Sequence, residues 1–178
     1  LGNTVGYRDH RTDGMDEEVY KIISLKDLYA RTGIQKAIFN TVYQLMAVKK
    51  KHPEYLEQAE TLLHVPDYFH FLLTGEKTCE YTEATTGQLV CPTTKDWDYE
   101  LIDMLGYPKK IFQKLIMPGT SIGHLTEEIK AEVGFDLEVV APATHDTGSA
   151  VLAVPANDDD FIYISSGTWS LMGIERKE

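Results

Sequence analysis

Hydrophobic residues recur at helical spacing through roughly the first two thirds of the chain, residues 1–115. An apolar position every three or four residues marks one face of an amphipathic helix that packs against a core. Asn40 and Thr41 precede one such stripe as capping residues, and Gly33 and Gly75 each follow one as a stop signal. We therefore predict helices over residues 15–24, 25–31, 41–51, 66–73, 100–105 and 110–115.

The pattern changes in the last third of the chain. The β-branched segment 137–141 predicts a short strand, and the small apolar residues of 146–154 predict a buried helix. Segments 161–165 and 170–174 resemble paired strands, with a hairpin turn at 166–169. Helices followed by a strand, a helix and a hairpin indicate the α/β fold class, helix-rich with a small sheet.

The composition is that of a globular chain with an excess of acidic groups. Its 178 residues are 43% hydrophobic and 25% charged, and the formal net charge is −11. Such a charge disfavours broad binding to nucleic acid. The sequence shows no apolar run long enough to cross a membrane and no leader peptide, so we expect no membrane partner. Cys79 and Cys91 lie outside any Cys-x-x-Cys motif, so we expect free thiols and a cytoplasmic location.

The first candidate for chemistry is Asp146, which follows the predicted strand and opens the predicted helix. Ligands of open α/β sheets gather beyond the carboxyl ends of strands. A carboxylate placed there is suited to act as a general base or to hold a metal ion. The structural alternative is that Asp146 is only the cap of its helix, since Asp is a favoured capping residue.

The second candidate is the predicted hairpin turn that contains Gly167 and Thr168. A glycine turn exposes backbone N–H groups, and a hydroxyl adds a further donor for phosphate oxygens. The alternative is an ordinary hairpin turn, in which glycine is common. If both candidates lie at the same sheet edge, one group accepts a hydroxyl proton while the other binds the transferred phosphate, as phosphoryl transfer to an alcohol requires.

The first candidate also allows other interpretations. Asp146-Thr147-Gly148 also matches the signature of aspartic proteases, in which two such aspartates share a proton, so a homodimer is required. That motif lies in a strand of an almost all-β protein, whereas this chain is mostly helical in pattern. A non-catalytic sugar-binding or scaffold module remains a further alternative, because fold does not determine function. The histidines lack metal-ligand spacing, so we expect no resident metal site.

An ordered series of short motifs resembles the FGGY family of carbohydrate kinases over nearly the whole chain. The series comprises Tyr7-Arg8-Asp9, Gly33-Ile34-Gln35, Phe39-Asn40-Thr41, Pro66-Asp67-Tyr68-Phe69, Leu73-Thr74-Gly75, Glu80-Tyr81-Thr82, Trp97-Asp98, His145-Asp146-Thr147 and Ser165-Ser166-Gly167-Thr168-Trp169-Ser170. Each motif is weak alone, but their order and spacing are specific together.

The resemblance implies an actin-like, ribonuclease-H-like ATPase domain that transfers the γ-phosphate of ATP, with Mg²⁺, to a sugar hydroxyl. The motifs are most similar to members that convert L-rhamnulose to L-rhamnulose 1-phosphate in L-rhamnose breakdown. By position, Asp146 matches the catalytic base, and His145 and Thr147 match sugar contacts. Gly167 and Thr168 match the turn that contacts phosphate. The implied partners are the sugar and ATP.

The chain departs from the family in extent. The family begins with a strand hairpin that carries an Asp-x-Gly phosphate motif, and its second domain supplies the adenosine site. Neither is found here, so we expect residues 1–178 to be one partial domain, the later part of the N-terminal kinase domain. The first strands and the C-terminal domain are then absent. We expect this chain alone to be inactive and to self-associate through an unpaired sheet edge.

Overall fold

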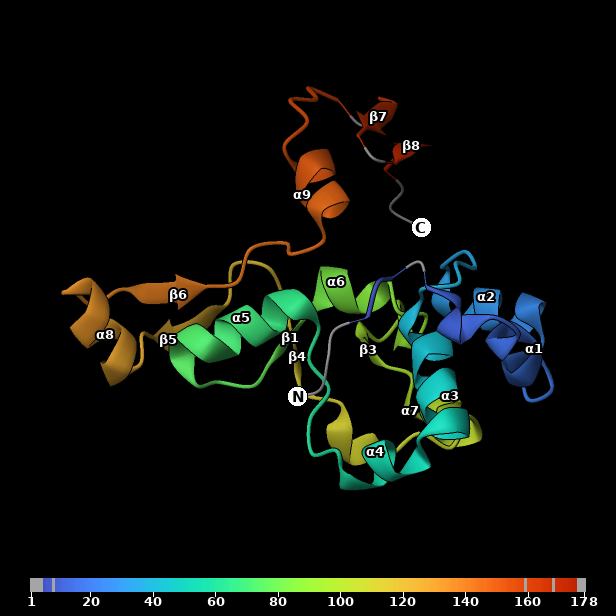
Figure 1. Ribbon diagram of the computed structural model, residues 1–178. Coiled ribbons are helices and arrows are strands. Elements are labelled where there is room, and N and C mark those ends of the chain that lie inside the picture. Colours follow the sequence, from blue (N-terminus) through green and yellow to red (C-terminus); the bar gives the residue numbers. More distant parts are fainter. Residues whose placement is uncertain (1–4, 8, 159, 168, 176–178) are drawn as a thin grey trace.

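The structure is a computed structural model that describes residues 5–7, 9–158, 160–167 and 169–175. Helices dominate the first part of the chain, and short strands are scattered between them (Figure 1). The helices are α1 (Met15–Tyr20), α2 (Leu25–Thr32), α3 (Thr41–Lys51), α4 (Pro53–Gln58), α5 (Val65–Thr74), α6 (Tyr81–Thr85), α7 (Tyr99–Met104), α8 (Glu127–Val133) and α9 (Asp146–Leu152), with 3₁₀ turns η1 (His10–Thr12) and η2 (Lys109–Ile111). The strands are β1 (Cys79–Glu80), β2 (Val90–Cys91), β3 (Asp96–Trp97), β4 (Leu115–Ile116), β5 (Ser121–His124), β6 (Glu138–Val140), β7 (Tyr163–Ser166) and β8 (Ser170–Gly173).

Most predicted helices form close to their expected bounds, and their ends follow the predicted signals. Gly33 and Gly75 follow α2 and α5 with φ of 70° and 79°, a left-handed conformation that glycine adopts without strain. Asn40 occupies the N-cap position of α3, but its side chain does not cap the helix. Its Oδ1 accepts from the N–H of Ala37 and its Nδ2 donates to the carbonyl of Thr86, which ties the start of α3 to the end of α6.

Two helix predictions were wrong in part or in full. The helix expected over residues 15–24 ends at Tyr20. The helix expected over 110–115 is instead the short turn η2 followed by the extended strand β4. The reason lies in the backbone carbonyls of this segment, which accept hydrogen bonds from distant donors rather than from the next helical turn. The donors are the N–H groups of Leu62 and Cys79 and the indole Nε1 of Trp97.

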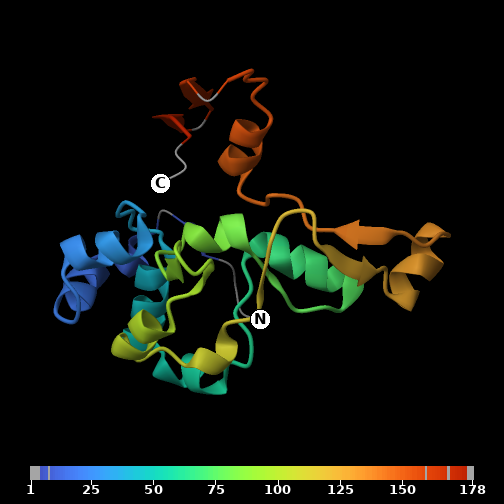
Figure 2. The same cartoon turned by 180° about the vertical axis from the view of Figure 1, so that it is seen from behind.

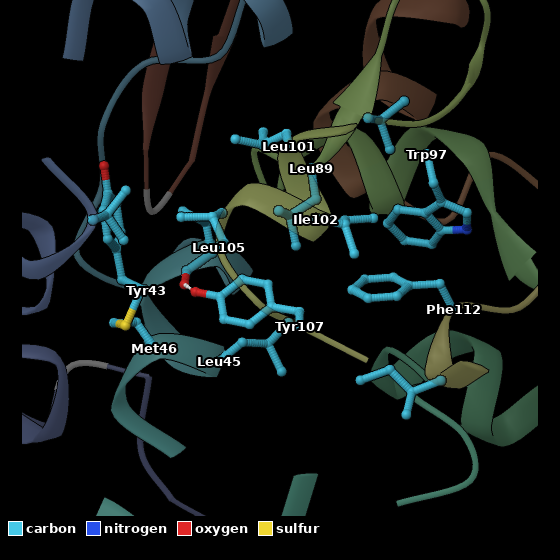
Figure 3. Packing of buried hydrophobic residues seen from close by; sticks show 14 of the residues in the cluster. Tyr43, Leu45, Met46, Leu89, Trp97, Leu101, Ile102, Leu105, Tyr107 and Phe112 are labelled. Atoms are coloured by element: carbon cyan, nitrogen blue, oxygen red, sulfur yellow. Dashed lines mark hydrogen bonds between the residues drawn. The ribbon is translucent and has the colours of Figure 1, made fainter. Parts of the chain in front are cut away.

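The main core centres on α3 and α7, with buried side chains from α1, α2 and the segments before and after α7 packed against them. Tyr43 and Met46 of α3 and Leu101 and Ile102 of α7 are almost completely buried. Figure 3 shows these side chains packed together, with the rings of Trp97 and Phe112 in contact at a centroid distance of 4.9 Å. Burial of this apolar surface is the dominant stabilising contribution to the fold.

The strands form four separate two-stranded ladders in the part of the chain that the structure describes. β1 pairs with β4 in parallel, and β2–β3, β5–β6 and β7–β8 pair antiparallel. The single small sheet expected from the sequence is therefore divided. The strand predicted over 137–141 forms as β6, and β5 is its unpredicted partner. The predicted hairpin forms as β7 and β8.

The last segment of the chain packs differently from the rest. Figures 1 and 2 show α9, β7 and β8 as a projection above α6, apart from the main core. The helix predicted over 146–154 forms as α9, but it is not buried: none of its residues is, and Leu152 is 78% exposed. Its small apolar residues follow the pattern of a core helix, yet among the described residues α9 packs only partly, against β7, and stays half-exposed. No helix among the described residues combines the length and apolar character needed to cross a membrane.

Candidate active site

Asp146 lies where the sequence places it, beyond the end of β6 and at the first residue of α9. The N-cap position belongs to His145, so the interpretation of Asp146 as a simple cap is wrong. The backbone N–H of Thr147 donates to Asp146 Oδ1 at 2.6 Å, and the Thr147 hydroxyl donates to the same oxygen at 3.2 Å. The Asp146 side chain is otherwise exposed, which leaves its carboxylate accessible to a substrate.

The loop before Asp146 is held by the side chain of Glu80, at the end of β1. This carboxylate is fully buried, and its Oε2 accepts from the backbone N–H of Thr144 at 3.1 Å and from the Thr144 hydroxyl at 2.8 Å. The next residue, His145, donates its backbone N–H to the hydroxyl oxygen of Thr82 at 3.2 Å. The two residues that precede Asp146 are thus attached to the start of α6.

Glu80 also organises α6 itself. Its carboxylate caps this helix by accepting from the backbone N–H groups of Thr82 and Glu83 at 2.9 and 3.1 Å, and the Thr82 hydroxyl donates to it as well. Burial raises the pKa of Glu80, but the donors from Thr82 and Thr144 favour the ionised form more strongly, and the net pKa lies below the ordinary value.

A second acidic group lies in the electrostatic field of His145. Glu83, partly buried on α6, has a raised pKa because burial disfavours its charged form. His64 and His145 act in the opposite direction on this pKa, while Asp67 and Glu80 raise it further. The charged groups that act on Glu83 among the described residues are therefore carboxylates and imidazoles.

The second candidate, the turn between β7 and β8, is described only in part. Thr168 lies outside the described residues, as does Arg8 of the first motif. Gly167 is exposed, and its N–H donates to the carbonyl of Trp169 at 2.8 Å, so this N–H is occupied within the turn. The expectation that Asp146 and this turn share one sheet edge was wrong for the described residues, because β6 pairs with β5 while β7 pairs with β8. The link between the two is instead the packing of α9 against β7.

One cluster offers donors that could hold a metal ion: His64, Asp67 and Cys79, whose donor atoms lie within 4.8 Å of one another. Burial raises the pKa of the Cys79 thiol to about 12. His64 Nδ1 lies 3.5 Å from Asp67 Oδ2, and Asp67 Oδ1 accepts the N–H of Glu80 at 2.8 Å. His64 Nδ1 and Asp67 Oδ2 have no hydrogen-bond partner among the described residues, so the cluster is a buried polar group beside β1 with two unsatisfied atoms.

Sequence reasoning identified Asp146 and its neighbours but missed Glu80, Thr82 and Thr144, which hold the loop. A signal was present, because Glu80-Tyr81-Thr82 belongs to the motif series and a glutamate directly after the apolar Cys79 is unusual for a buried segment. What the sequence could not provide is the pairing between positions 80 and 144, which depends on how the chain folds back.

Comparison with known proteins agrees with this geometry. Residues 1–153 match the model of the N-terminal domain of the FGGY family of carbohydrate kinases. The chain is 56% identical to a rhamnulokinase of Halalkalibacterium halodurans over 98% of its own length and 37% of the relative. It is 47% identical to a rhamnulokinase of Pectobacterium atrosepticum, over 98% of this chain and 34% of that protein. The chain thus spans little more than a third of the length of these curated relatives.

Solved structures give the same result for the fold. A carbohydrate kinase from Novosphingobium aromaticivorans superposes with a TM-score of 0.72 at 26% identity, over 90% of this chain and 35% of that one. A ligand-bound xylulose kinase from Lactobacillus acidophilus superposes with a TM-score of 0.72 at 24% identity, over 80% of this chain and 29% of that one. These neighbours show that the fold is that of part of a sugar kinase. By its match over residues 1–153, the chain belongs to the FGGY family of carbohydrate kinases.

Proposed function

We propose that the protein phosphorylates a sugar hydroxyl with ATP, and that its substrate is L-rhamnulose, converted to L-rhamnulose 1-phosphate in L-rhamnose breakdown. The observation that carries this proposal is the 56% identity to a rhamnulokinase over almost the whole chain. The exposed carboxylate of Asp146 at the start of α9, inside the motif that resembles the family's catalytic segment, supports it. Because the chain spans 37% of that relative, the activity is proposed for the complete protein.

We assign the role of general base to Asp146. Its carboxylate accepts the proton of the sugar hydroxyl as the hydroxyl oxygen forms a bond to the γ-phosphorus of ATP and the bond to ADP breaks. Both hydrogen bonds from Thr147 use Oδ1, so we assign Oδ2 to the sugar hydroxyl. His145 and Thr147 flank the base as sugar contacts, and Gly167 and Thr168 are assigned to the transferred phosphate. Mg²⁺ bound with ATP would neutralise phosphate charge.

The same proposal includes the setting in which the protein acts. Its partners are the sugar and ATP, and nucleic acid and membranes are not among them. We propose a cytoplasmic location, where ATP is available and where free thiols such as Cys79 and Cys91 stay reduced.

The test of the reaction is sugar-dependent release of ADP by the complete protein with Mg·ATP. L-rhamnulose is compared with xylulose, ribulose and glycerol at matched concentrations. We expect kcat/KM for L-rhamnulose to exceed that for the other three acceptors. Turnover that favours another acceptor would overturn the substrate assignment. Sugar binding without ADP release from any acceptor would overturn the kinase assignment and favour the non-catalytic module.

The test of the base is Asp146→Asn, which keeps the shape of the side chain and removes its ability to take a proton. We expect turnover to fall by about 10²–10⁴-fold, the usual contribution of a general base. The matched control is Asp158→Asn, since Asp158 is an exposed acidic residue that makes only a local bond to the N–H of Asp160. Near-normal turnover by the Asp146→Asn protein would contradict the assignment.

A further inference from the structure

Glu80 is a buried carboxylate with no cationic partner among the described residues. Its side chain is fully inaccessible, and none of the ion pairs found among the described residues includes it. In the part of the chain that the structure describes, its charge is balanced by hydrogen-bond donors from Thr82, Glu83 and Thr144. A buried charge is costly unless such donors compensate it, and here the donors of α6 are joined by those of Thr144.

The donors come from two segments that are far apart in sequence. The Thr82 and Glu83 donors belong to α6, next to Glu80, whereas the Thr144 donors belong to the loop before α9. The Thr82 hydroxyl donates to Glu80 and at the same time accepts from the N–H of His145. Glu80 therefore fixes Thr144 directly and His145 through one intermediate, and the next residue is Asp146.

The other end of Glu80 is also fixed. Its backbone N–H donates to the buried Asp67 at 2.8 Å, and its strand β1 pairs with β4, where Glu80 lies opposite Ile116. The segment that carries Asp146 has less support: no described residue from 142 to 175 is buried, and its ring contact with the main body, Trp169 against Phe39 at 5.9 Å, lies away from the loop before Asp146. The polar links to Glu80 and Thr82 are thus the main described attachment of the loop before Asp146 to the main body.

We propose that Glu80, acting through Thr82 and Thr144, is a positioning residue that sets the place and orientation of Asp146 for proton transfer. This inference rests on the proposed function, since it assumes that Asp146 is the base. A base displaced by a fraction of an ångström loses its alignment with the sugar hydroxyl, so a remote substitution can reduce the chemical step while leaving nucleotide binding intact. Glu80 itself touches neither the sugar nor ATP in this scheme.

The first test replaces the two threonine hydroxyls separately in the complete protein. Thr144→Val and Thr82→Val keep side-chain volume and remove one donor each. We expect kcat with L-rhamnulose to fall by about tenfold or more, and KM for ATP to change less than about twofold. Thr144→Ser and Thr82→Ser keep the hydroxyl, and we expect them to restore kcat. The matched control is Thr86→Val, whose hydroxyl donates only to the nearby carbonyl of Glu83.

A second test uses Glu80→Gln, which replaces one carboxylate oxygen by an NH₂ group. If this group takes the place of Oε2, its N–H donors face the N–H and hydroxyl donors of Thr144. We expect it to lower kcat more than either valine variant does. If this protein does not fold, the threonine variants still decide the question. Double substitution Thr82→Val with Thr144→Val then lowers kcat below either single variant, because the two hydroxyls hold adjacent residues of one loop.

The outcomes separate this inference from the proposed function. If the unmodified protein phosphorylates no sugar, the proposed function fails. If it is active and the valine variants match Thr86→Val in kcat, the positioning role is overturned while the kinase assignment stands. A fall in thermal stability with unchanged kcat would also overturn it, since that is the result of a purely structural role.

Discussion

The main body and the segment that carries Asp146 differ in how they are held. In the main body, α3 and α7 contribute side chains that are almost fully buried, and the strands between them close the core (Figure 3). In the segment from 142 to 175, no described residue is buried, and its contacts to α6 are a few polar bonds. The loop before the candidate base is therefore held mainly by directed hydrogen bonds, whereas the main body is held mainly by apolar packing.

Because of this difference, substitutions in the two regions should affect different properties of the protein. Apolar packing is lost in proportion to the volume removed, and its loss appears as a lower free energy of unfolding. Directed bonds contribute little net stability, but they define the position of one loop closely. Substitutions in the body should therefore change stability, and those around Glu80 should change turnover.

The largest stability effect is expected for Leu101→Ala. Leu101 lies on α7 with no exposed surface, in contact with the main core. Removing its methyl groups leaves a cavity, so we expect the free energy of unfolding to fall by about 2–5 kcal/mol, measured by urea unfolding at neutral pH. A loss below about 0.5 kcal/mol would mean that the body is not packed as described.

A smaller, pH-dependent effect is expected at Asp98. Arg31 donates to both carboxylate oxygens of Asp98 at 2.7 and 2.8 Å, and Asp98 Oδ1 also accepts the N–H of Leu101. These bonds lower the pKa of Asp98, with Arg31 as the largest cause. A pKa lower in the folded than in the unfolded chain stabilises the fold at neutral pH, and the gain is lost as the pH falls through the native pKa.

Asp98→Asn should therefore cost about 1–2 kcal/mol at neutral pH and less in acid. The free energy of unfolding of the unmodified chain should fall more steeply than that of the variant as the pH drops from about 5 to about 2. Parallel curves for the two proteins over that range would contradict the role of this ion pair. Urea unfolding at a series of pH values provides the measurement.

An effect of about 1 kcal/mol is expected for Tyr107→Phe. The buried Tyr107 hydroxyl donates to the carbonyl of Val42 at 2.7 Å, which joins the segment after α7 to the first turn of α3. The matched control is Tyr29→Phe, because the Tyr29 side chain is 55% exposed. Equal unfolding free energies for the two variants would show that the bond contributes nothing to stability.

The smallest effect is expected for Leu152→Ala on α9, the counterpart of Leu101→Ala. Leu152 is 78% exposed, so the free energy of unfolding should change by less than about 0.5 kcal/mol. A large loss would mean that another surface covers α9. Self-association of the isolated chain is a prediction of the sequence. Light scattering on the same sample would then show whether the surface that covers α9 is a second copy of the chain.

The sequence predicted those elements whose pattern and boundary signals agree. α2, α3 and α5 combine an apolar stripe with a glycine stop or a lysine-rich last turn, and all three formed. The segment 110–115 carries the same kind of stripe, but its carbonyls accept from Leu62, Cys79 and Trp97, which no local pattern indicates. Short strands such as β1 and β4 are too brief to show any period.

For the candidate site too, the sequence predicted the features that local patterns encode and missed those that depend on distant contacts. The motif placed Asp146 at the start of a helix, because the change from a β-branched to a small apolar pattern and the resemblance are both local in sequence. It did not give the exposure of α9, which depends on what surrounds the helix. It also did not give the contact of Glu80 with Thr144, which joins residues 64 positions apart.

The most direct test of this account is hydrogen exchange by mass spectrometry on peptides that span the loop before Asp146. Thr82→Val is compared with the control Thr86→Val, and peptides of α3 serve as the internal reference. We predict that exchange at Thr144 and His145 becomes about tenfold faster or more in Thr82→Val alone, with α3 unchanged. Equal exchange in the two variants would contradict the claim that polar links to α6 hold the candidate base in place.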